Sequence, residues 1–483
     1  MKFSNQEDIK KSLTGIVEII SEKEAKIIDE IRLKDELIDK LVFEATFNQD
    51  KGVVELSRQL IKNIAVEKGI ILSSVYEYYK KKAKDRRKFT IPAINVRGMA
   101  YNTARAIFEA VKKDRVTAFI LEIAKSEIGY TEQRPIEYTT SILAAAIKED
   151  YRGLLFLQGD HFQINAGKYK ENPAAEEEGI KKLIREAIEA GFYQVDLDMS
   201  TLVDWSKEGY DAQQEPNYKE TALLTAYVRD LEKELELDKL GIVINLGGEI
   251  GEIGKGIQGR NSIVEDLRAF MKGYLKELTV FSEKRGYQLK GITKIAVQSG
   301  TKHGGIRDEK GNVIKGIKVS FNTLAEIGKI AREEYGLAGA VQHGASTLDP
   351  RCFVLFASYP PPEGFEISEE LLTKENAKIL SDNPAAEVHL ATAYQDTILD
   401  HPDFPKELAQ KIKKWVLDNY PPKEGEDPEK AYIDNRKNIW GPFKFELWNL
   451  PSDVQDSLRK SLVKQFSEDV FKNLGVRDLN FIG

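Results

Sequence analysis

An alternation of short apolar runs with helical segments, between residues 89 and 391, constrains the fold of this chain more than any other feature. Eight such runs are present, and most are separated by segments with helical spacing. Continuous apolar strands that alternate with helices indicate a parallel sheet covered on both faces. Eight repeats favour an α/β fold of the closed (β/α)8 TIM barrel type, and the alternative is an open doubly wound sheet. The expected strands are 91–96, 117–123, 153–157, 192–197, 241–246, 292–297, 338–342 and 387–391, and the expected helices are 101–113, 136–148, 174–190, 218–237, 264–284 and 323–335.

The regions on either side of this repeat have a different pattern. Residues 1–85 are expected to form a helical N-terminal extension, because six isoleucines from Ile16 to Ile31 recur at helical spacing with charges between them. Such an extension either packs on the core or builds an oligomer. Residues 86–400 are the expected catalytic barrel, and residues 401–483 are expected to form a C-terminal helical segment packed on the barrel.

Composition limits the classes of partner. The net charge is 71 − 78 = −7, with both signs interspersed, which argues against a general nucleic-acid surface. The single cysteine, Cys352, excludes an internal disulfide and is typical of a reducing cytoplasm. No apolar run approaches the length of a membrane span, and no apolar segment follows residues 1–8 as it would in a signal peptide. We therefore expect a cytoplasmic protein without nucleic-acid or membrane partners.

Three of the five histidines, His161, His303 and His343, lie at the carboxyl ends of expected strands. Catalytic groups of a (β/α)8 barrel lie at this end. Three neutral imidazoles with a vacant fourth position make a catalytic zinc site, which polarises a carbonyl or activates a bound oxygen. A single histidine is more often a polar side chain satisfied by hydrogen bonds, but three in this arrangement predict a metal enzyme.

Seven short motifs follow one another in order along the expected barrel and its C-terminal segment. They are residues 91–96, Gly159-Asp160-His161, residues 196–200, residues 248–251, residues 300–304, residues 343–346 and Tyr432-Ile433-Asp434-Asn435-Arg436. Together they resemble the class II, zinc-dependent fructose-bisphosphate aldolases, nearer to the class IIA branch. The resemblance implies aldol cleavage and condensation of a ketose bisphosphate, with a role in glycolysis and gluconeogenesis.

The resemblance also implies a metal site and an acid–base group. His161, His303 and His343 would hold one catalytic Zn²⁺, and a monovalent cation is left open as a further cofactor. Asp160 would act on the C4 hydroxyl of the substrate. The chemistry supports this role independently, because a carboxylate beside a metal-bound histidine lies near the polarised oxygen, where proton transfer is needed.

Further roles follow from the same resemblance. Asp198 and Glu249 form either a second, non-catalytic metal position or groups that orient the zinc ligands, and we favour orientation. The substrate is a phosphorylated sugar, and the protein is expected to be a homo-oligomer. Backbone amides in glycine-containing turns suit phosphate, and an arginine fork binds it bidentately. The implied substrate and phosphate contacts are Gly304, Gly344, Ser346, His389, Thr392 and, from a neighbouring subunit, Arg436.

Three departures from the family pattern bear on the reaction. Residues 254–259 lack the acidic stretch that supplies the carboxylate for proton exchange at C3 of dihydroxyacetone phosphate. Glu252 is the nearest substitute, and His389 is the alternative base. His389 also stands where the family has a substrate-contacting asparagine, which leaves the ketose open. Ala124 stands where the family usually has a serine.

Two other functions compete with a fructose-bisphosphate aldolase. One is a non-catalytic, aldolase-like partner subunit of a tagatose-bisphosphate aldolase, or an enzyme for a different phosphorylated ketose. The complete histidine trio favours an enzyme, whereas the lost acidic stretch favours a partner role or a changed substrate. The other is a metal-dependent hydrolase, which usually carries two histidines one residue apart on the first strand. Residues 95–97 are Asn, Val and Arg, so they do not fit this class.

Overall fold

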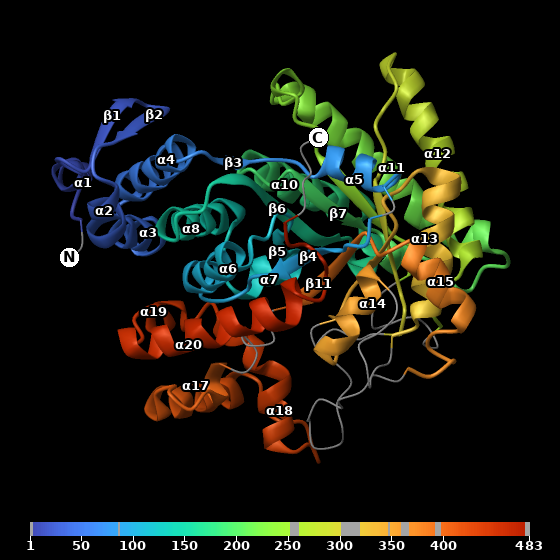
Figure 1. Ribbon diagram of the computed structural model, residues 1–483. Coiled ribbons are helices and arrows are strands. Elements are labelled where there is room, and N and C mark those ends of the chain that lie inside the picture. Colours follow the sequence, from blue (N-terminus) through green and yellow to red (C-terminus); the bar gives the residue numbers. More distant parts are fainter. Residues whose placement is uncertain are drawn as a thin grey trace.

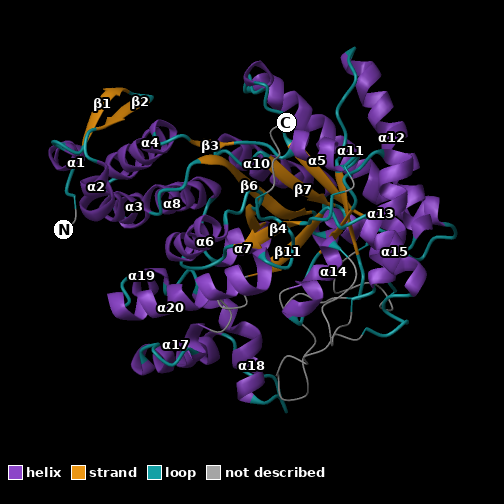
Figure 2. Ribbon diagram, viewed as in Figure 1, coloured by secondary structure: helices purple, strands orange, loops and turns teal. Residues whose placement is uncertain are grey.

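A ring of parallel strands forms the centre of the molecule (Figures 1 and 2). The computed structural model describes residues 3–85, 87–251, 260–300, 319–345, 348–358, 367–391 and 398–478. Within these residues eight strands pair in parallel with their neighbours in chain order, and β11 pairs with β4 to close the barrel. The predicted TIM barrel is therefore confirmed. The strands are β4 (Ile91–Asn95), β5 (Ile120–Ala124), β6 (Gly153–Gln163), β7 (Gln194–Asp198), β8 (Asn245–Glu249), β9 (Lys294–Val297), β10 (Ala340–Gln342) and β11 (Glu387–Ala391).

Helices cover the outside of the barrel, and their ends carry ordinary capping signals. Ser320 accepts a hydrogen bond from the backbone N–H of Thr323 at the start of α13, and Gly336 ends that helix with a positive φ of 64°. The covering helices are α6 (Ala100–Asp114), α8 (Pro135–Lys148), α10 (Pro173–Glu189), α11 (Tyr210–Glu234), α12 (Val264–Arg285), α13 (Phe321–Tyr335) and α15 (Lys374–Asp382). Shorter connecting helices are α7 (Lys125–Tyr130), α9 (Ala166–Glu171), η2 (Ser200–Leu202), η3 (Asp238–Leu240), η6 (Pro350–Phe353) and α14 (Val354–Ala357).

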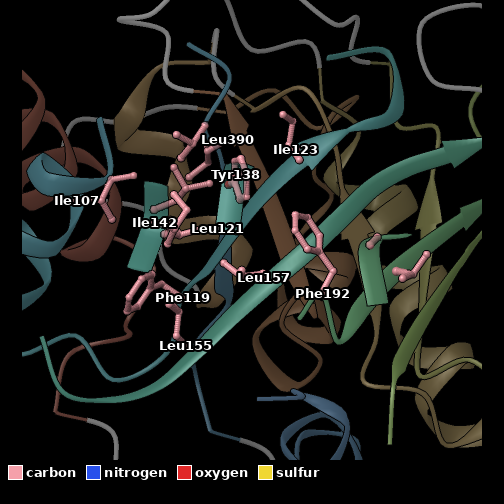
Figure 3. Packing of buried hydrophobic residues seen from close by; sticks show 14 of the residues in the cluster. Ile107, Phe119, Leu121, Ile123, Tyr138, Ile142, Leu155, Leu157, Phe192 and Leu390 are labelled. Atoms are coloured by element: carbon pink, nitrogen blue, oxygen red, sulfur yellow. The ribbon is translucent and has the colours of Figure 1, made fainter. Parts of the chain in front are cut away.

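The main apolar core lies between the barrel and these helices. Side chains of β5 and β6 that point outward, such as Leu121 and Leu157, pack against Ile142 and Tyr138 of α8 (Figure 3). Because side chains alternate along a strand, the residues between them point into the barrel. In β5 the inward residue Glu122 lies between Leu121 and Ile123, so the alternation places a charged group in the barrel interior.

One strand differs from its predicted position. The fifth run was predicted over residues 241–246, but β8 covers Asn245–Glu249. Gly241 ends η3 with a positive φ of 70°, so the start of the run forms a turn. The strand continues instead through Gly247 and Gly248, although glycine is depleted in strands. The shift moves Glu249 from the loop to the last position of the strand.

The N-terminal extension is mostly helical, but it also contains strands. Residues 17–27, predicted as helix, form a hairpin of β1 (Val17–Ser21) and β2 (Glu24–Ile27). Ile19 and Ile20 are 41% and 49% exposed, so the isoleucines of this segment do not form the buried face of an amphipathic helix. Their β-branched side chains favour a strand instead. A third strand, β3 (Ile70–Leu72), pairs in parallel with the start of β6. The helices are α1 (Gln6–Leu13), α2 (Glu30–Arg32), η1 (Leu33–Leu37), α3 (Ile38–Phe47), α4 (Lys51–Glu67) and α5 (Tyr76–Lys82).

Helix α5 closes the barrel at the amino ends of its strands. Val75 and Tyr79 belong to an apolar cluster that includes Ile91 of β4, Ile120 of β5 and Val341 of β10. Since parallel strands present their amino ends at one side, this cluster lies at the end of the barrel opposite the predicted site. The N-terminal extension is therefore part of the barrel's packing.

The C-terminal segment packs along the same barrel. Helix α20 lies against α6, and backbone N–H groups of Thr90 and Thr117 donate to the carbonyls of Leu474 and Val476. No helix among the described residues is long and apolar enough to cross a membrane. The elements are η7 (Ile398–Asp400), α17 (Lys406–Asn419), α18 (Pro428–Asn435), η8 (Arg436–Ile439), α19 (Lys444–Trp448), α20 (Ser452–Gln465) and η9 (Phe466–Phe471).

Candidate active site

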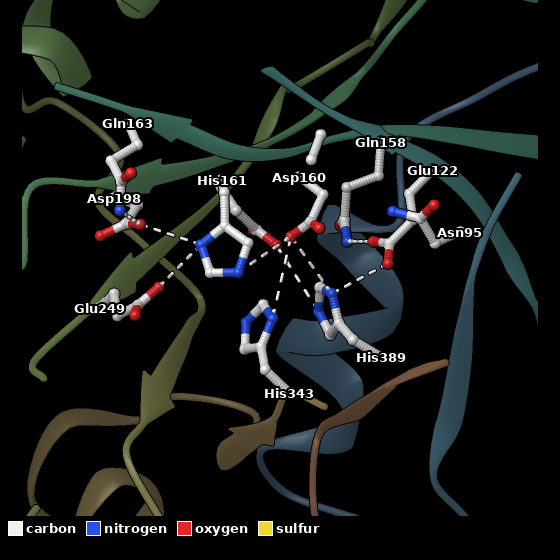
Figure 4. Close-up of polar contacts among 12 residues, drawn as sticks. Asn95, Glu122, Gln158, Asp160, His161, Gln163, Asp198, Glu249, His343 and His389 are labelled. Carbon is white, nitrogen blue, oxygen red and sulfur yellow. Dashed lines mark hydrogen bonds and ion pairs between the residues drawn. The ribbon is translucent and has the colours of Figure 1, made fainter. Parts of the chain in front are cut away.

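Acidic and histidine side chains from five strands or their ends converge at the carboxyl end of the barrel (Figure 4). They come from β6, β7, β8, the end of β10, and β11, which are well separated in the sequence. Barrel closure brings these strand ends together, because the carboxyl ends of all eight strands meet at one rim. The converging residues are Asp160, His161, Asp198, Glu249, His343 and His389.

A β-bulge places two consecutive residues, Asp160 and His161, in this one site. Side chains of neighbouring residues in a regular strand point to opposite faces. The pairing of β6 with β7 shifts register between Gly159 and Phe162, and His161 has a positive φ of 42°. Bulges re-aim side chains, and strained backbone of this kind clusters at functional sites. Gly159 permits the bulge, because a Cβ there would lie 2.5 Å from the Phe162 ring.

The His161 ring is oriented by carboxylates on its Nδ1 side. Nδ1 lies 2.9 Å from Oδ2 of Asp198 and 3.3 Å from Oε2 of Glu249. Asp198 is itself held, since the Ser200 hydroxyl and the Gln163 amide each donate to it at 2.6 Å. A carboxylate behind a histidine fixes its tautomer and directs the other ring nitrogen toward a metal.

The other ring nitrogen of His161 faces Asp160 and His343. Nε2 of His161 and Nδ1 of His343 each lie 3.9 Å from Oδ1 of Asp160, and the two rings are 4.4 Å apart between centroids. One ligand atom from each of these residues can be chosen so that all three lie within 4.8 Å of one another. Ligand atoms on one zinc ion are separated by roughly 3–4 Å. Imidazole nitrogens this close together suit a transition-metal ion, so His161 and His343 fit the predicted metal, with the Asp160 carboxylate beside them.

Buried acidic groups surround the His161 ring and shift one another's pKa values. Burial raises the pKa of Glu249 to about 8, and the charge of Asp198 adds to this effect. Burial alone would lower the pKa of His161, but Asp160, Glu249 and Asp198 hold that pKa well above its usual value. The site thus favours a positive charge near His161, which either a proton or a metal cation satisfies.

A second polar group lies deeper in the barrel, and we call it the interior polar network. It consists of Glu122, Gln158, Asp196, Lys294 and Glu387. Lys294 is almost fully buried, and its Nζ lies 2.7 Å from Oε1 of Glu387 and 2.9 Å from Asp196. Burial raises the pKa of Glu122 to about 7 and that of Asp196 to about 6. The interior of such barrels is usually filled by bulky branched apolar side chains, so these charges depart from the usual packing.

His389 connects the two groups of residues. Its Nδ1 lies 3.0 Å from Oε1 of Glu122 and 3.3 Å from Oδ1 of Asp160, while its Nε2 lies 2.6 Å from Oε1 of Glu387. Its ring also lies 3.8 Å from that of His343 between centroids. The residue that replaces the family's asparagine therefore touches both the metal-site residues and the interior polar network.

The predicted site residues divide into those that the structure brings together and those that it leaves elsewhere. Gly344 follows His343 directly and has a positive φ of 69°. Arg436, on the C-terminal segment, forms a 2.9 Å ion pair with Asp400. Its predicted phosphate contact stays a prediction. The predicted residues Glu252, His303, Gly304, Ser346 and Thr392 lie outside the described residues.

The interior polar network was missed by sequence reasoning. The signal was present, because Lys294 lies inside an apolar run and Glu387 begins another. A charged residue inside an otherwise apolar strand is almost never buried without a partner. Tyr79, whose phenol donates to Oε2 of Glu387, carries no such signal, since it lies on a helix among other tyrosines.

Known proteins resemble this chain in sequence or in structure. The sequence profile of the family described as fructose-bisphosphate aldolase class-II matches residues 76–400. No curated protein sequence shows a significant match. Among solved structures, fructose-bisphosphate aldolase from Campylobacter jejuni is 19% identical, with a TM-score of 0.42 over 85% of this chain and 97% of that one. Fructuronate-tagaturonate epimerase from Cohnella laeviribosi is 12% identical, with a TM-score of 0.47 over 90% and 87%. The family match confirms what the motifs predicted: the chain belongs to the class II fructose-bisphosphate aldolase family.

Proposed function

We propose that this chain is a metal-dependent aldolase that interconverts fructose 1,6-bisphosphate with dihydroxyacetone phosphate and glyceraldehyde 3-phosphate. The observation that carries the proposal is the meeting of Asp160 with His161 and His343 at the carboxyl rim of a barrel of this family. A carboxylate next to two imidazoles provides both the ligands for a divalent ion and an acid–base group beside it.

His161, His303 and His343 would hold one zinc ion. Bound there, the ion supplies a Lewis acid that polarises the ketone of the substrate and offsets negative charge in the transition state. The support for this assignment is the orientation of His161, whose Nδ1 is occupied by Asp198 and Glu249. Those two carboxylates then act by fixing the ring, in line with the orienting role favoured from the sequence.

Asp160 is the proposed acid–base group at the C4 hydroxyl. Its side chain is 7% exposed, and Oδ1 lies between the rings of His161, His343 and His389. In the cleavage direction it accepts the hydroxyl proton as the C3–C4 bond breaks, and in condensation it returns that proton. Burial of Asp160 limits the loss of that proton to bulk water.

A second acid–base group must exchange the proton at C3 of dihydroxyacetone phosphate. We assign this step to Glu252, because it follows the last residue of β8 by three positions in the sequence and is the nearest carboxylate to the stretch that is acidic in the family. His389 would contact substrate. Phosphate would be held by Gly304, Gly344, Ser346 and Thr392, and by Arg436 of a neighbouring copy in a cytoplasmic homo-oligomer.

A cleavage assay with metal removal tests the proposal. The purified protein should cleave fructose 1,6-bisphosphate, lose activity with a chelator and regain it with Zn²⁺. His161→Ala should abolish both metal binding and cleavage. His401→Ala is the matched control, because His401 lies on the C-terminal segment near Ser461 and should leave both unchanged. A metal-free protein with full activity would contradict the proposal.

A second candidate substrate is favoured by His389 in place of asparagine. A bulkier, charged side chain at that position alters the pocket for the sugar, and a polar pocket discriminates strongly between substrates. The same assay with tagatose 1,6-bisphosphate measures this directly. A higher kcat/KM for the tagatose epimer would assign the chain to that ketose. Inactivity toward both, with metal bound, would favour the non-catalytic partner subunit.

A further inference from the structure

Helix α5 of the N-terminal extension reaches the barrel interior through one phenol. Tyr79 is fully buried, and its ring packs among apolar side chains at the amino ends of the strands. Its hydroxyl donates a hydrogen bond to Oε2 of Glu387 on β11. Burial and the nearby Glu387 charge raise the pKa of Tyr79 well above its usual value, so the phenol remains a donor. The extension therefore contributes a polar contact to the interior as well as apolar packing.

The Tyr79 hydroxyl contacts one of the two oxygens of the Glu387 carboxylate. On its other oxygen, Oε1, Glu387 accepts hydrogen bonds from Lys294 and from the Gln158 amide, both at 2.7 Å. With Tyr79 on Oε2, both oxygens of this fully buried carboxylate are fixed. A buried charged oxygen that loses its donor is costly, so the carboxylate would turn toward whatever donor remained.

The orientation of Glu387 matters because its Oε1 also contacts His389. Nε2 of His389 lies 2.6 Å from that oxygen, and Nδ1 on the opposite side of the ring lies 3.3 Å from Oδ1 of Asp160. A rotation of Glu387 would therefore move the histidine that faces Asp160 and whose tilted ring lies beside that of His343 (Figure 4). These contacts form one continuous series from the N-terminal extension to the candidate acid–base group.

Gly247 on β8 leaves room in the barrel interior for the charged side chains that adjoin this series of contacts. A Cβ on Gly247 would lie 2.3 Å from Oδ1 of Asp196 and 2.8 Å from Cε of Lys294. Glycine at this strand position lets the lysine and its acidic partners sit side by side. A purely structural role for Tyr79 would require only its ring, whereas here the hydroxyl is directed at a carboxylate.

We propose that Tyr79 is a positioning residue of the active site, which acts through Glu387 to hold His389 beside Asp160. The catalytic part of this inference rests on the proposed aldolase function. The geometric part does not, because it concerns the position of a histidine ring that can be observed without substrate.

Tyr79→Phe removes the hydroxyl and keeps the ring, so it isolates the proposed contact. Tyr78→Phe is the matched control, since Tyr78 is the preceding residue of α5 and its ring packs on Phe156 at 5.4 Å between centroids. Both variants are compared with the parent in the zinc-loaded full-length protein. The measurements are kcat and KM for fructose 1,6-bisphosphate, bound zinc, the thermal midpoint, and side-chain ¹⁵N signals of the five histidines.

In Tyr79→Phe, kcat should fall about tenfold, in the range for partners that orient an active-site residue, while KM and zinc content stay unchanged. The ¹⁵N signals of His389 should shift and those of His401 should not. Tyr78→Phe should match the parent in kcat, KM, zinc content and the His389 signals. Glu387→Gln should also shift His389, which provides a second test if Tyr79→Phe folds poorly.

Unshifted His389 signals in a folded Tyr79→Phe protein would overturn the proposal, and so would unshifted signals in Glu387→Gln if Tyr79→Phe folds poorly. An equal loss of kcat in Tyr78→Phe and Tyr79→Phe, in step with the thermal midpoint, would also overturn it and leave a structural role. If the parent protein cleaves no ketose bisphosphate, the proposed function fails, but a His389 shift confined to Tyr79→Phe and Glu387→Gln would still support the positioning role.

Discussion

Asp198 fixes the ring of His161, with Oδ2 of the carboxylate 2.9 Å from Nδ1 of the imidazole. The carboxylate is buried, and although burial opposes its charge, the His161 contact and the Ser200 hydrogen bonds lower its pKa below the usual value. It therefore stays ionised at neutral pH and holds the imidazole with Nε2 toward Asp160. We propose that the metal affinity of the site depends on this relationship.

Asp198→Asn should weaken zinc binding by about 10–100-fold, because the ring of His161 loses its charged partner. Competition with a chromophoric chelator measures the affinity. Asp211→Asn is the control, since Asp211 is an exposed acid that pairs with Lys272. Equal zinc affinity in the parent and in Asp198→Asn would show that the His161 ring is held by other contacts.

Asp160→Ala should lower kcat for cleavage by about 10²–10⁴-fold and change KM little, because proton transfer occurs in the transition state. Steady-state kinetics on the metal-loaded variant, with bound zinc measured in the same sample, separates lost chemistry from lost metal. Turnover close to that of the parent would remove Asp160 from the mechanism.

Gly247→Ala should destabilise the barrel by about 1–3 kcal/mol, because the added methyl meets Asp196 and Lys294 in a packed interior. Denaturant unfolding measures the change in the free energy of unfolding. Gly179→Ala in α10 is the control, since no atom lies within 4 Å of its Cβ position. It should stabilise the helix by about 0.5–1 kcal/mol. An unchanged free energy of unfolding in Gly247→Ala would mean that the Lys294–Asp196 ion pair rearranges freely to admit the methyl group.

Asp150→Asn should weaken the attachment of the N-terminal extension by about 1–3 kcal/mol. Asp150 lies 2.6 Å from Nζ of Lys34 and 3.1 Å from Nζ of the buried Lys68. Burial opposes the charge of Asp150, but the two lysines lower its pKa from 3.8. The folded pKa is thus below the unfolded one. The stabilisation is fully present above the unfolded value and is lost as the pH falls through the folded value.

Thermal unfolding at several pH values checks this prediction. The difference between the parent and Asp150→Asn should be constant near neutral pH and should shrink below about pH 4. Asparagine suits the position, because Asp150 has a positive φ of 57°. Asp35→Asn, an exposed site in η1, is the control. A difference that grew toward acid pH would contradict the assigned direction of the shift.

Much of the fold could be predicted from the sequence, because the signals for strands and covering helices are local. The prediction of residues 387–391 matches β11, and that of residues 264–284 differs from α12 by one residue. The helix predicted for residues 16–31 was wrong over β1 and β2, since the spacing of six isoleucines does not show which of them become buried. Only contacts with the rest of the N-terminal extension decide that.

The candidate site could likewise be predicted from the sequence only in part. The sequence by itself determined that histidines and acids follow apolar strands, and from this the class of chemistry and Asp160, His161 and His343 could be named. It did not determine that Lys294 and Glu387, 93 residues apart, would form an ion pair, or that Tyr79 would reach Glu387 from outside the strands. The tertiary structure decided these contacts, because barrel closure fixes which inward side chains face one another, and the bulge at His161 turns it toward the site. Residue spacing along the chain does not contain those distances.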